Sequence, residues 1–447
     1  MESTGSSHSR NVSRSSRPRS STRGPLDEPE DPLSVISSVQ TQRTADRSAF
    51  SGASFAALDP LAPDEILQGS GKDLSYLLRY DVYHSLSQVD IPPALRSEFI
   101  APASDESLSQ TLGSLEKLLA EGHFLLAAYL CGTILTSSTI SPTDAKLIFA
   151  LFYTRLACLE LSGNAVLAAQ ESKALEDLSS SFYYVEPTLE KSESLDAHSH
   201  PSYPRHIVPW PLRVLAVRMQ SIGFGDPRRG IGGLFEIGLE ARREILRPDL
   251  TATERQIWKD RLSDLGIRNV NALVEMGDLN AARRSLHNLR ASTTETIESE
   301  LNTLRKVLLF LLIGDLDAAK NLSSKSNEAE AIYTPLLSMA EGRYGDAVSE
   351  WKAVLENGSR SLDEAIVSQN LAVCLLYTGR LNEAREVLES LVKTNQSFYS
   401  LVFNLSTIYE LCSDKAGILK TELVDTIAKQ PITGHINLDR SNADFKL

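Results

Sequence analysis

Three histidines that are close together in the sequence are the first candidates for chemistry. His198, His200 and His206 lie in a stretch rich in proline and serine. A zinc site usually combines histidine with cysteine, or places two histidines one helical turn apart, and this stretch has neither arrangement. We therefore expect solvated histidines here and no metal site.

A glycine-rich run is the second candidate. Residues 223–233 have the glycine content of a phosphate-binding loop, but no strand precedes them and no Gly-Lys-Ser/Thr sequence follows. Gly225 fits the turn of a helical hairpin, which explains the run better than phosphate binding does. Since no other part of the chain carries a catalytic set, we expect no catalytic residues, no cofactor and no enzyme activity.

A glycine is followed five residues later by a small residue at seven places, each at the start of an apolar stretch of helical period. The pairs are Gly122/Ala127, Gly163/Ala168, Gly225/Gly230, Gly277/Ala282, Gly314/Ala319, Gly342/Ala347 and Gly379/Ala384. Glycine ends a helix by adopting a left-handed conformation, and the small residue lets the next helix pack closely against the first. The pattern predicts helical hairpins, with a spacing that is in places about the 34 residues of a tetratricopeptide (TPR) repeat.

Some units carry the pattern beyond the glycine, because Tyr344 and Trp351 occupy the large-residue positions of theirs. The residues that define the repeats are Gly277, Ala282, Gly314, Ala319, Gly342, Tyr344, Ala347, Trp351, Gly379 and Ala384. Each hairpin alone leaves an apolar face uncovered, so its stability must come from stacking on its neighbours. We expect an all-α, TPR-like helical-repeat solenoid with a disordered N-terminal tail.

The composition divides the chain into five parts. They are a disordered tail rich in serine, arginine and proline (1–71), N-terminal helical hairpins (72–182), an inserted loop or linker (183–208), a TPR-like solenoid (209–430) and a polar C-terminal tail (431–447). Within this scheme, Ser141-Pro142 predicts the start of the second hairpin. Residues 421–429 predict a helix that caps the C-terminal end.

Charge and cysteine usage limit the possible partners and surroundings. The net charge of −13 argues against nucleic acid, because phosphate binding usually requires a basic surface. The four cysteines form no CxxC pair and lie in apolar helical patterns, which is typical of small core residues in a reduced, cytosolic compartment. The sequence shows neither a signal peptide nor a membrane-spanning stretch, so we expect any membrane association to be indirect.

Two asparagines are candidates for binding a partner. Asn370 and Asn404 fall at equivalent positions in the first helices of successive hairpins, where such arrays usually line a concave surface. An asparagine on that surface can bind a peptide backbone through both its donor and its acceptor. A local hydrogen bond between helices explains the two residues equally well at this point.

Several strings resemble one known family. Residues 370–381 and 401–411 look like the end of subunit 12 of the trafficking protein particle (TRAPP) complexes, and residues 207–210 and 257–262 are similar to earlier parts of the same family. The resemblance covers roughly residues 200 to 430 in matching order. The first 100 residues have no recognisable counterpart in the family.

The resemblance implies a non-catalytic scaffold subunit of a vesicle-tethering complex. The core of that complex is a guanine-nucleotide exchange factor for a Rab-type GTPase in ER-to-Golgi traffic and autophagy. The expected partners of this chain are other TRAPP subunits, above all the large subunit 11. Its expected indirect partners are a Rab-type GTPase and the ER and Golgi membranes. The expected location is the cytoplasm, at the periphery of these membranes.

Two other functions compete with this interpretation. A stand-alone TPR adaptor for short peptides of chaperone-type partners would need lysines or arginines beside the asparagines, and residues 362–377 and 397–411 contain none. An enzyme with an appended helical array would need a further domain with strands, and only residues 72–104 lack a repeat assignment.

Overall fold

The structure, a computed structural model, describes residues 71–87, 107–185, 204–289, 297–323, 330–356 and 364–430. Within these ranges the chain forms sixteen α-helices and two strands of two residues each, so the predicted all-α class is confirmed. Residues 1–70 of the predicted N-terminal tail (1–71) and the whole predicted C-terminal tail (431–447) lie outside the described residues. None of the described helices has the length and apolar content that crossing a bilayer requires.

Eight hairpins account for all the α-helices of the described ranges. In chain order they are α2 (Leu108–Ala120) with α3 (Phe124–Thr136), α4 (Ala145–Leu161) with α5 (Ala165–Ser172), α6 (Trp210–Phe224) with α7 (Pro227–Ile245), α8 (Ala252–Glu275) with α9 (Leu279–Asn288), α10 (Ile297–Ile313) with α11 (Leu316–Ser323), α12 (Glu330–Ala340) with α13 (Tyr344–Glu356), α14 (Glu364–Tyr377) with α15 (Leu381–Lys393), and α16 (Tyr399–Cys412) with α17 (Ala416–Ala428). Each helix packs against the next one along the chain.

All seven predicted glycines sit in hairpin turns with a positive φ, from 61° at Gly225 to 84° at Gly163. In every turn the residue after the glycine donates its N–H to the carbonyl five residues earlier, over 2.8–3.1 Å. This is the Schellman arrangement, which satisfies carbonyls that a helix end leaves unpaired. The eighth hairpin turns without glycine, at Ser413.

The small residues five positions after the glycines also lie where the pattern predicts. The six alanines of this set are fully buried. In the remaining pair, a Cβ added at Gly230 would approach Ser221 Cβ at 2.6 Å, so α6 and α7 cross too closely there for a side chain. The glycine-rich run therefore serves a helix turn and a helix contact, as the sequence analysis prefers.

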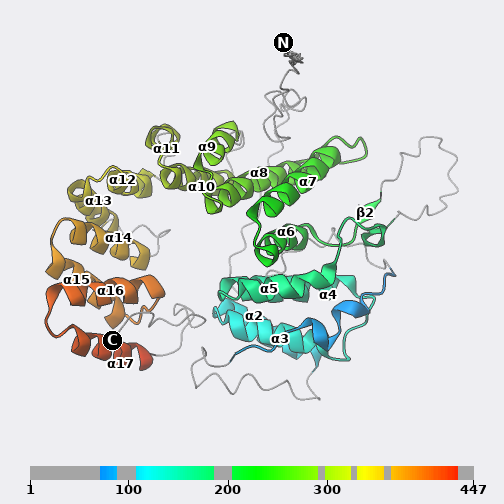
Figure 1. The fold of residues 1–447 in the computed structure, drawn as a ribbon, viewed down its shortest axis with the longest axis horizontal. Coiled ribbons are helices and arrows are strands. Elements are labelled where there is room, and N and C mark those ends of the chain that lie inside the picture. The colour runs from blue at the N-terminus through cyan, green and yellow to red at the C-terminus, as the bar shows by residue number, and fades with distance from the viewer. Residues whose placement is uncertain are drawn as a thin grey trace, which may run out of the picture.

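The hairpins follow one another along an arch (Figure 1). The helices α10, α14 and α16 lie toward the inside of the arch, and α9, α11 and α15 run along its outside. Contacts between α4 and α6, between α8 and α10, and between α10 and α12 join the first helices of successive hairpins. The assignment of these hairpins to the TPR class stays a prediction.

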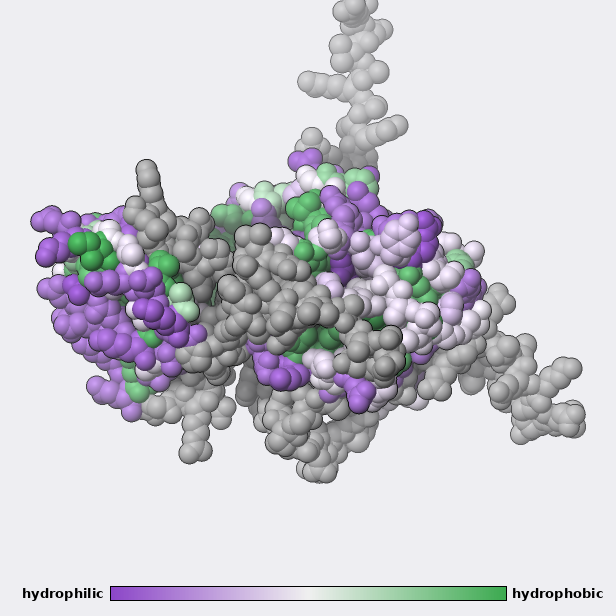
Figure 2. All heavy atoms as spheres, turned by 90° about the horizontal axis from the view of Figure 1, so that it is seen from below, coloured by the Kyte–Doolittle hydropathy of each residue, from purple (hydrophilic) through white to green (hydrophobic). Residues whose placement is uncertain are grey.

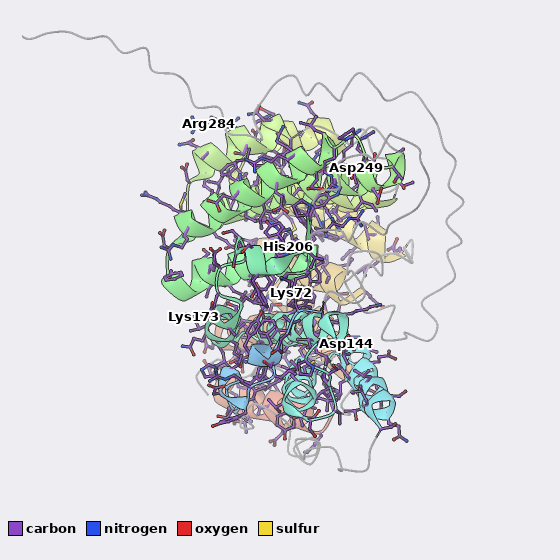
Figure 3. The ribbon with its side chains drawn as sticks, turned by 90° about the vertical axis from the view of Figure 1, so that its right-hand side faces the viewer. Lys72, Asp144, Lys173, His206, Asp249 and Arg284 are labelled. Carbon is purple, nitrogen blue, oxygen red and sulfur yellow. The ribbon has the colours of Figure 1, made fainter. Side chains whose placement is uncertain are left out.

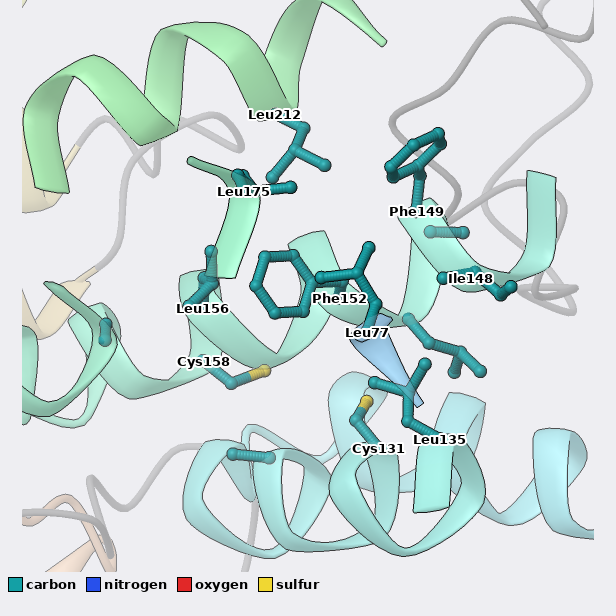
Figure 4. Packing of buried hydrophobic residues seen from close by; sticks show 14 of the residues in the cluster. Leu77, Cys131, Leu135, Ile148, Phe149, Phe152, Leu156, Cys158, Leu175 and Leu212 are labelled. Carbon is teal, nitrogen blue, oxygen red and sulfur yellow. The ribbon is translucent and has the colours of Figure 1, made fainter. Parts of the chain in front are cut away.

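The core runs through the array as a chain of overlapping apolar clusters. Figure 4 shows part of the N-terminal cluster, in which residues of α3, α4 and α6 pack together. Leu77, which precedes the hairpins, is fully buried in the same cluster. Cys131, Cys158 and Cys374 are buried and Cys412 is partly buried, so the predicted core role is confirmed for the first three.

Residues 71–87 form two short 3₁₀ turns, Ser75–Leu77 and Tyr80–Val82, in the segment that has no repeat assignment. The Leu74 amide donates to the Pro142 carbonyl over 2.9 Å. Because Ser141 and Pro142 lie in a separate turn, in which the Asp144 N–H donates to the Ser141 carbonyl over 2.9 Å, the helix of the second hairpin does not start there. Helix α4 begins at Ala145, with Asp144 as its N-cap.

The C-terminal capping helix is longer than predicted. Helix α17 begins at Ala416, five positions before the expected start, and ends at Ala428. Its Leu423 is buried in the C-terminal cluster, and the neighbouring Gln430 side chain donates to the Val392 carbonyl over 2.8 Å.

The two ends of the predicted inserted loop pair with each other. Strand β1 (Tyr184–Val185) lies antiparallel to strand β2 (Arg205–His206), with Tyr184 opposite His206. Residues 186–203, including His198 and His200, lie outside the described residues. The loop therefore leaves and returns to the array at one place, immediately before α6.

Candidate interaction surface

The first helices of the later hairpins carry large apolar side chains that the fold leaves exposed. We call the exposed and partly exposed residues of α8, α10, α12, α14 and α16 the inner face. Its exposed large apolar residues are Ile257, Leu308, Leu312, Ile366, Tyr377, Tyr399, Phe403 and Leu411. Seen from below, the C-terminal side has separate hydrophobic patches in a hydrophilic surface (Figure 2). Exposed apolar residues within a polar surround are typical of sites of protein–protein contact.

Both candidate asparagines lie on the inner face. Asn370 of α14 and Asn404 of α16 are partly buried, and each stands nine positions before the turn residue of its hairpin, Gly379 or Ser413. Within the described ranges neither amide group makes a hydrogen bond to another side chain or to the backbone. The interhelical hydrogen bond that would explain them locally is absent from these residues.

The two helices that carry the asparagines also carry exposed aromatic rings. Tyr377 of α14 stacks on Tyr344 of α13, with ring centroids 4.4 Å apart and planes 9° from parallel. Tyr399 and Phe403 of α16 stack with centroids 6.0 Å apart. A flat, rigid aromatic surface offers a large contact area at a small cost in side-chain entropy, which is why aromatic residues are enriched at interfaces.

The sequence analysis missed two arginines of the inner face. Arg268 of α8 stands nine positions before Gly277, and Arg305 of α10 stands nine positions before Gly314. Each arginine therefore stands at the same position in its hairpin as Asn370 does in the hairpin of α14 and α15. The spacing to the turn glycine is the sequence signal that could have found them.

An ion-pair bridge joins three first helices near the N-terminal end of this face. Arg218 of α6 pairs with Glu160 of α4 and, through Nη1 at 3.1 Å, with Glu275 of α8. All three side chains retain solvent contact, so the bridge stabilises the array only modestly. It links the α6 side chain to acidic side chains of the hairpins on both sides.

The prediction that the three histidines are solvated is wrong for His206. Its Nε2 lies 2.9 Å from the Leu178 carbonyl, and its Nδ1 accepts the Val208 N–H over 3.0 Å. The imidazole stacks on Tyr183 with ring centroids 5.9 Å apart, and its position is labelled in Figure 3. Burial and then the nearby Arg213 charge lower the pKa of His206 to about 4. A neutral, structural imidazole results.

The three tryptophans pack against apolar clusters, with Trp210 and Trp351 buried and Trp258 half-buried. Trp210 and Trp258 meet edge to face with centroids 5.2 Å apart, and Arg261 lies over the Trp258 ring at 4.5 Å. Trp351 is fully buried, and its indole N–H points at the Met339 sulfur over 3.2 Å. Among the described residues, no three or more histidine, cysteine or acidic side chains are grouped so as to hold a metal ion.

The comparisons with known proteins point to one family. No protein-family model matches the chain. The chain is 23% identical over 363 residues to trafficking protein particle complex subunit 12 of Homo sapiens, and 23% identical over 364 residues to the Mus musculus protein of that name. Each alignment covers 72% of this chain but only 47% and 44% of the relatives, so the chain spans about half their length. The likeness is distant, and it agrees with the family that the sequence strings resemble.

Proposed function

We propose that this chain is a non-catalytic scaffold subunit of a TRAPP-type vesicle-tethering complex. The observation that carries the proposal is the similarity to two subunit 12 proteins along 72% of the chain. Stacked hairpins offer a long surface for other subunits and need no catalytic group for that role. The array would hold neighbouring subunits in place.

The more detailed role follows from the same family. The chain would join a complex that exchanges the nucleotide of a Rab-type GTPase in ER-to-Golgi traffic and autophagy, without forming the exchange site itself. Its direct neighbour would be the large subunit 11. It would reside in the cytoplasm and reach ER and Golgi membranes through the other subunits.

The inner face is the surface proposed to meet another subunit. Around Asn370 and Asn404 it combines exposed aromatic and aliphatic side chains with amide groups that have no partner in the described residues. It has no basic residue there, so its partner would be held by apolar contact and by neutral hydrogen bonds. Such contacts suit a permanent subunit interface better than capture of a charged peptide end.

Direct binding tests the proposal. The purified full chain is mixed with purified TRAPP large subunit 11 and analysed by size-exclusion chromatography with light scattering. We expect a complex of defined mass, and separate elution of the two proteins at micromolar concentration would contradict the proposed contact.

A second assay separates scaffolding from catalysis. The chain alone should leave the rate of nucleotide release from the Rab-type GTPase unchanged, whereas the complex that contains it should raise that rate. Exchange by the isolated chain would contradict a non-catalytic role.

A further inference from the structure

A groove lies between the first helices of two successive hairpins, α8 and α10. It has a volume of about 450 Å³ and opens to solvent. One side is formed by Asp264, Ile267 and Arg268 of α8, and the other by Arg305, Leu308 and Leu312 of α10. Because α8 and α10 contact each other directly, the floor is made by packed side chains of the array itself.

The rim of the groove has more positive than negative charge. Arg268 Nε donates to Asp264 Oδ2 over 2.6 Å, and Arg305 Nη1 lies 3.6 Å from Asp264 Oδ1. Two guanidinium groups thus share one carboxylate, and neither pairs with another acid of the described residues. Both arginine side chains are about half exposed. A guanidinium has five N–H donors, so most of the donors on this rim remain available to a second carboxylate.

Beyond Arg305, the α10 side of the groove is apolar and exposed. Leu308 and Leu312 stand one turn apart on α10, exposed by 41% and 64%, above the buried Leu309 and Ile267. Covering such side chains contributes roughly 25 cal/mol for each Å² of apolar surface removed from water. A single inorganic anion could satisfy the arginines but would leave these leucines in water.

We propose that the groove between α8 and α10 binds an acidic, leucine-bearing segment of a partner protein. A carboxylate of the partner would accept hydrogen bonds from Arg268 and Arg305, and an apolar side chain beside it would cover Leu308 and Leu312. Charge complementarity selects this occupant, since the rim is locally positive on a chain of net charge −13. At physiological ionic strength, the overall negative charge is screened beyond about 8 Å and does not prevent the contact.

The position of the two arginines supports binding along the inner face. Arg268, Arg305, Asn370 and Asn404 all stand nine positions before the turn residue of their hairpins. The corresponding residue of α12, Tyr333, is buried, so this spacing places a polar side chain in four of the five first helices from α8 to α16. The groove would recognise the acidic part of a partner whichever complex the chain joins.

The test uses the full chain and a fluorescein-labelled peptide made of alternating pairs of leucine and glutamate. A second peptide has lysine in place of every glutamate, and a third has serine in place of every leucine. Fluorescence anisotropy should show saturable binding of the leucine–glutamate peptide only. Arg268→Glu/Arg305→Glu should weaken this binding at least tenfold and should bind the lysine peptide better than the unchanged protein does. Leu312→Ala should weaken it as well.

Arg385→Glu is the matched control, because Arg385 also forms an i,i+4 pair, with Glu389, but on α15 outside the groove. It should leave peptide binding unchanged, and circular dichroism should show equal helix content in all variants. Equal binding by the double variant, or equal binding of the glutamate and lysine peptides, would overturn the proposal.

The acidic residues Asp27, Glu28, Glu30 and Asp31 of the same chain are a competing occupant. Their combined change to asparagine and glutamine, in the full chain, should not alter the affinity for the peptide. If the peptide bound only after this change, the groove would belong to the chain's own segment and the assignment to a partner would be wrong.

Discussion

Arg155 and Glu171 form a buried ion pair between α4 and α5. The Arg155 Nε and Nη2 atoms donate to the two Glu171 carboxylate oxygens over 2.6 and 2.7 Å, and both side chains are almost completely buried. Arg155 also donates to the carbonyls of Ala128 and His84, while the His84 N–H donates to Glu171. The pair therefore fastens residues 71–87 to the first two hairpins.

Breaking this pair should destabilise the N-terminal hairpins strongly. Glu171→Gln leaves a buried guanidinium without its counter-charge, which typically costs about 3–5 kcal/mol of unfolding free energy. Urea unfolding measured by circular dichroism should show the loss, and hydrogen exchange should rise in residues 71–87.

Arg343→Met removes an arginine from an exposed ion pair with Glu341 and serves as the control. It should leave the urea midpoint almost unchanged. If both variants unfolded at the urea midpoint of the unchanged protein, the buried pair would not have the role described here.

The turn glycines should be needed for their backbone conformation and not for space. Gly277 and Gly314 both have φ of +83°, and a Cβ added at either would meet nothing within 4 Å. Replacing one by alanine should therefore cost about 1–2 kcal/mol through the left-handed backbone alone. Gly345→Ala is the control, because this helical glycine also has open space but no positive φ, and the change should stabilise the chain by up to about 1 kcal/mol. Thermal unfolding of the variants distinguishes the two effects, and an equal loss in all three would contradict the explanation.

His206 should make the stability of the chain depend on pH. Its pKa is about 4 in the folded chain against 6.5 in the unfolded one, so the unfolded state binds more protons between these values. The contribution of His206 to the free energy of unfolding is complete above about pH 6.5 and is lost as the pH falls toward 4. The loss is on the order of 2–3 kcal/mol. His206→Gln removes this titration, so the difference in unfolding free energy between neutral pH and pH of about 4.5 should be smaller in the variant. Identical pH profiles for the two proteins would argue against a buried neutral imidazole.

Cysteine reactivity should follow burial. Burial raises the pKa of the Cys131 thiol to about 12 and that of Cys374 to about 11, so both stay protonated at neutral pH. Cys158 is buried as well, and only Cys412 retains partial exposure. An aromatic disulfide reagent should therefore modify Cys412 first in the native protein and all four cysteines in denaturant. Rapid native modification of Cys131 would show that the N-terminal core opens easily.

The hairpins could be predicted from the sequence because their signals are local. A glycine such as Gly379 and an alanine such as Ala384 report a turn and a close helix contact within a few residues, and both lie as predicted. The predicted start of α4 was wrong because Ser141 and Pro142 lie in a turn before the helix, and the Pro142 carbonyl accepts the Leu74 N–H, a contact that local patterns do not reveal. The prediction for His206 was wrong for a similar reason, since its partner Leu178 lies 28 positions earlier in the chain.

The candidate site was only partly predictable. Asn370 and Asn404 could be placed on first helices from the repeat spacing alone. The groove between α8 and α10 depends on side chains from two hairpins that meet only in the folded array, so Arg268 and Arg305 were not recognised together. Whether the asparagines bind a partner stays a prediction.

Asparagine and aromatic changes on the inner face should weaken assembly without unfolding the chain. Asn370→Ala/Asn404→Ala combined with Tyr377→Ala removes exposed or half-buried groups and should reduce the recovery of partner subunits several-fold. Leu279→Ala removes an exposed apolar residue from α9 and is the control, which should leave recovery unchanged. An equal recovery with both variants would show that the inner face is not the interface.

The most direct test of the account is quantitative mass spectrometry of the full-length chain, tagged at its own locus and purified in mild salt. The account predicts several TRAPP subunits in amounts that match the tagged chain, with subunit 11 among them. Recovery of the chain alone, or with a chaperone as its single stoichiometric companion, would contradict the proposed scaffold role.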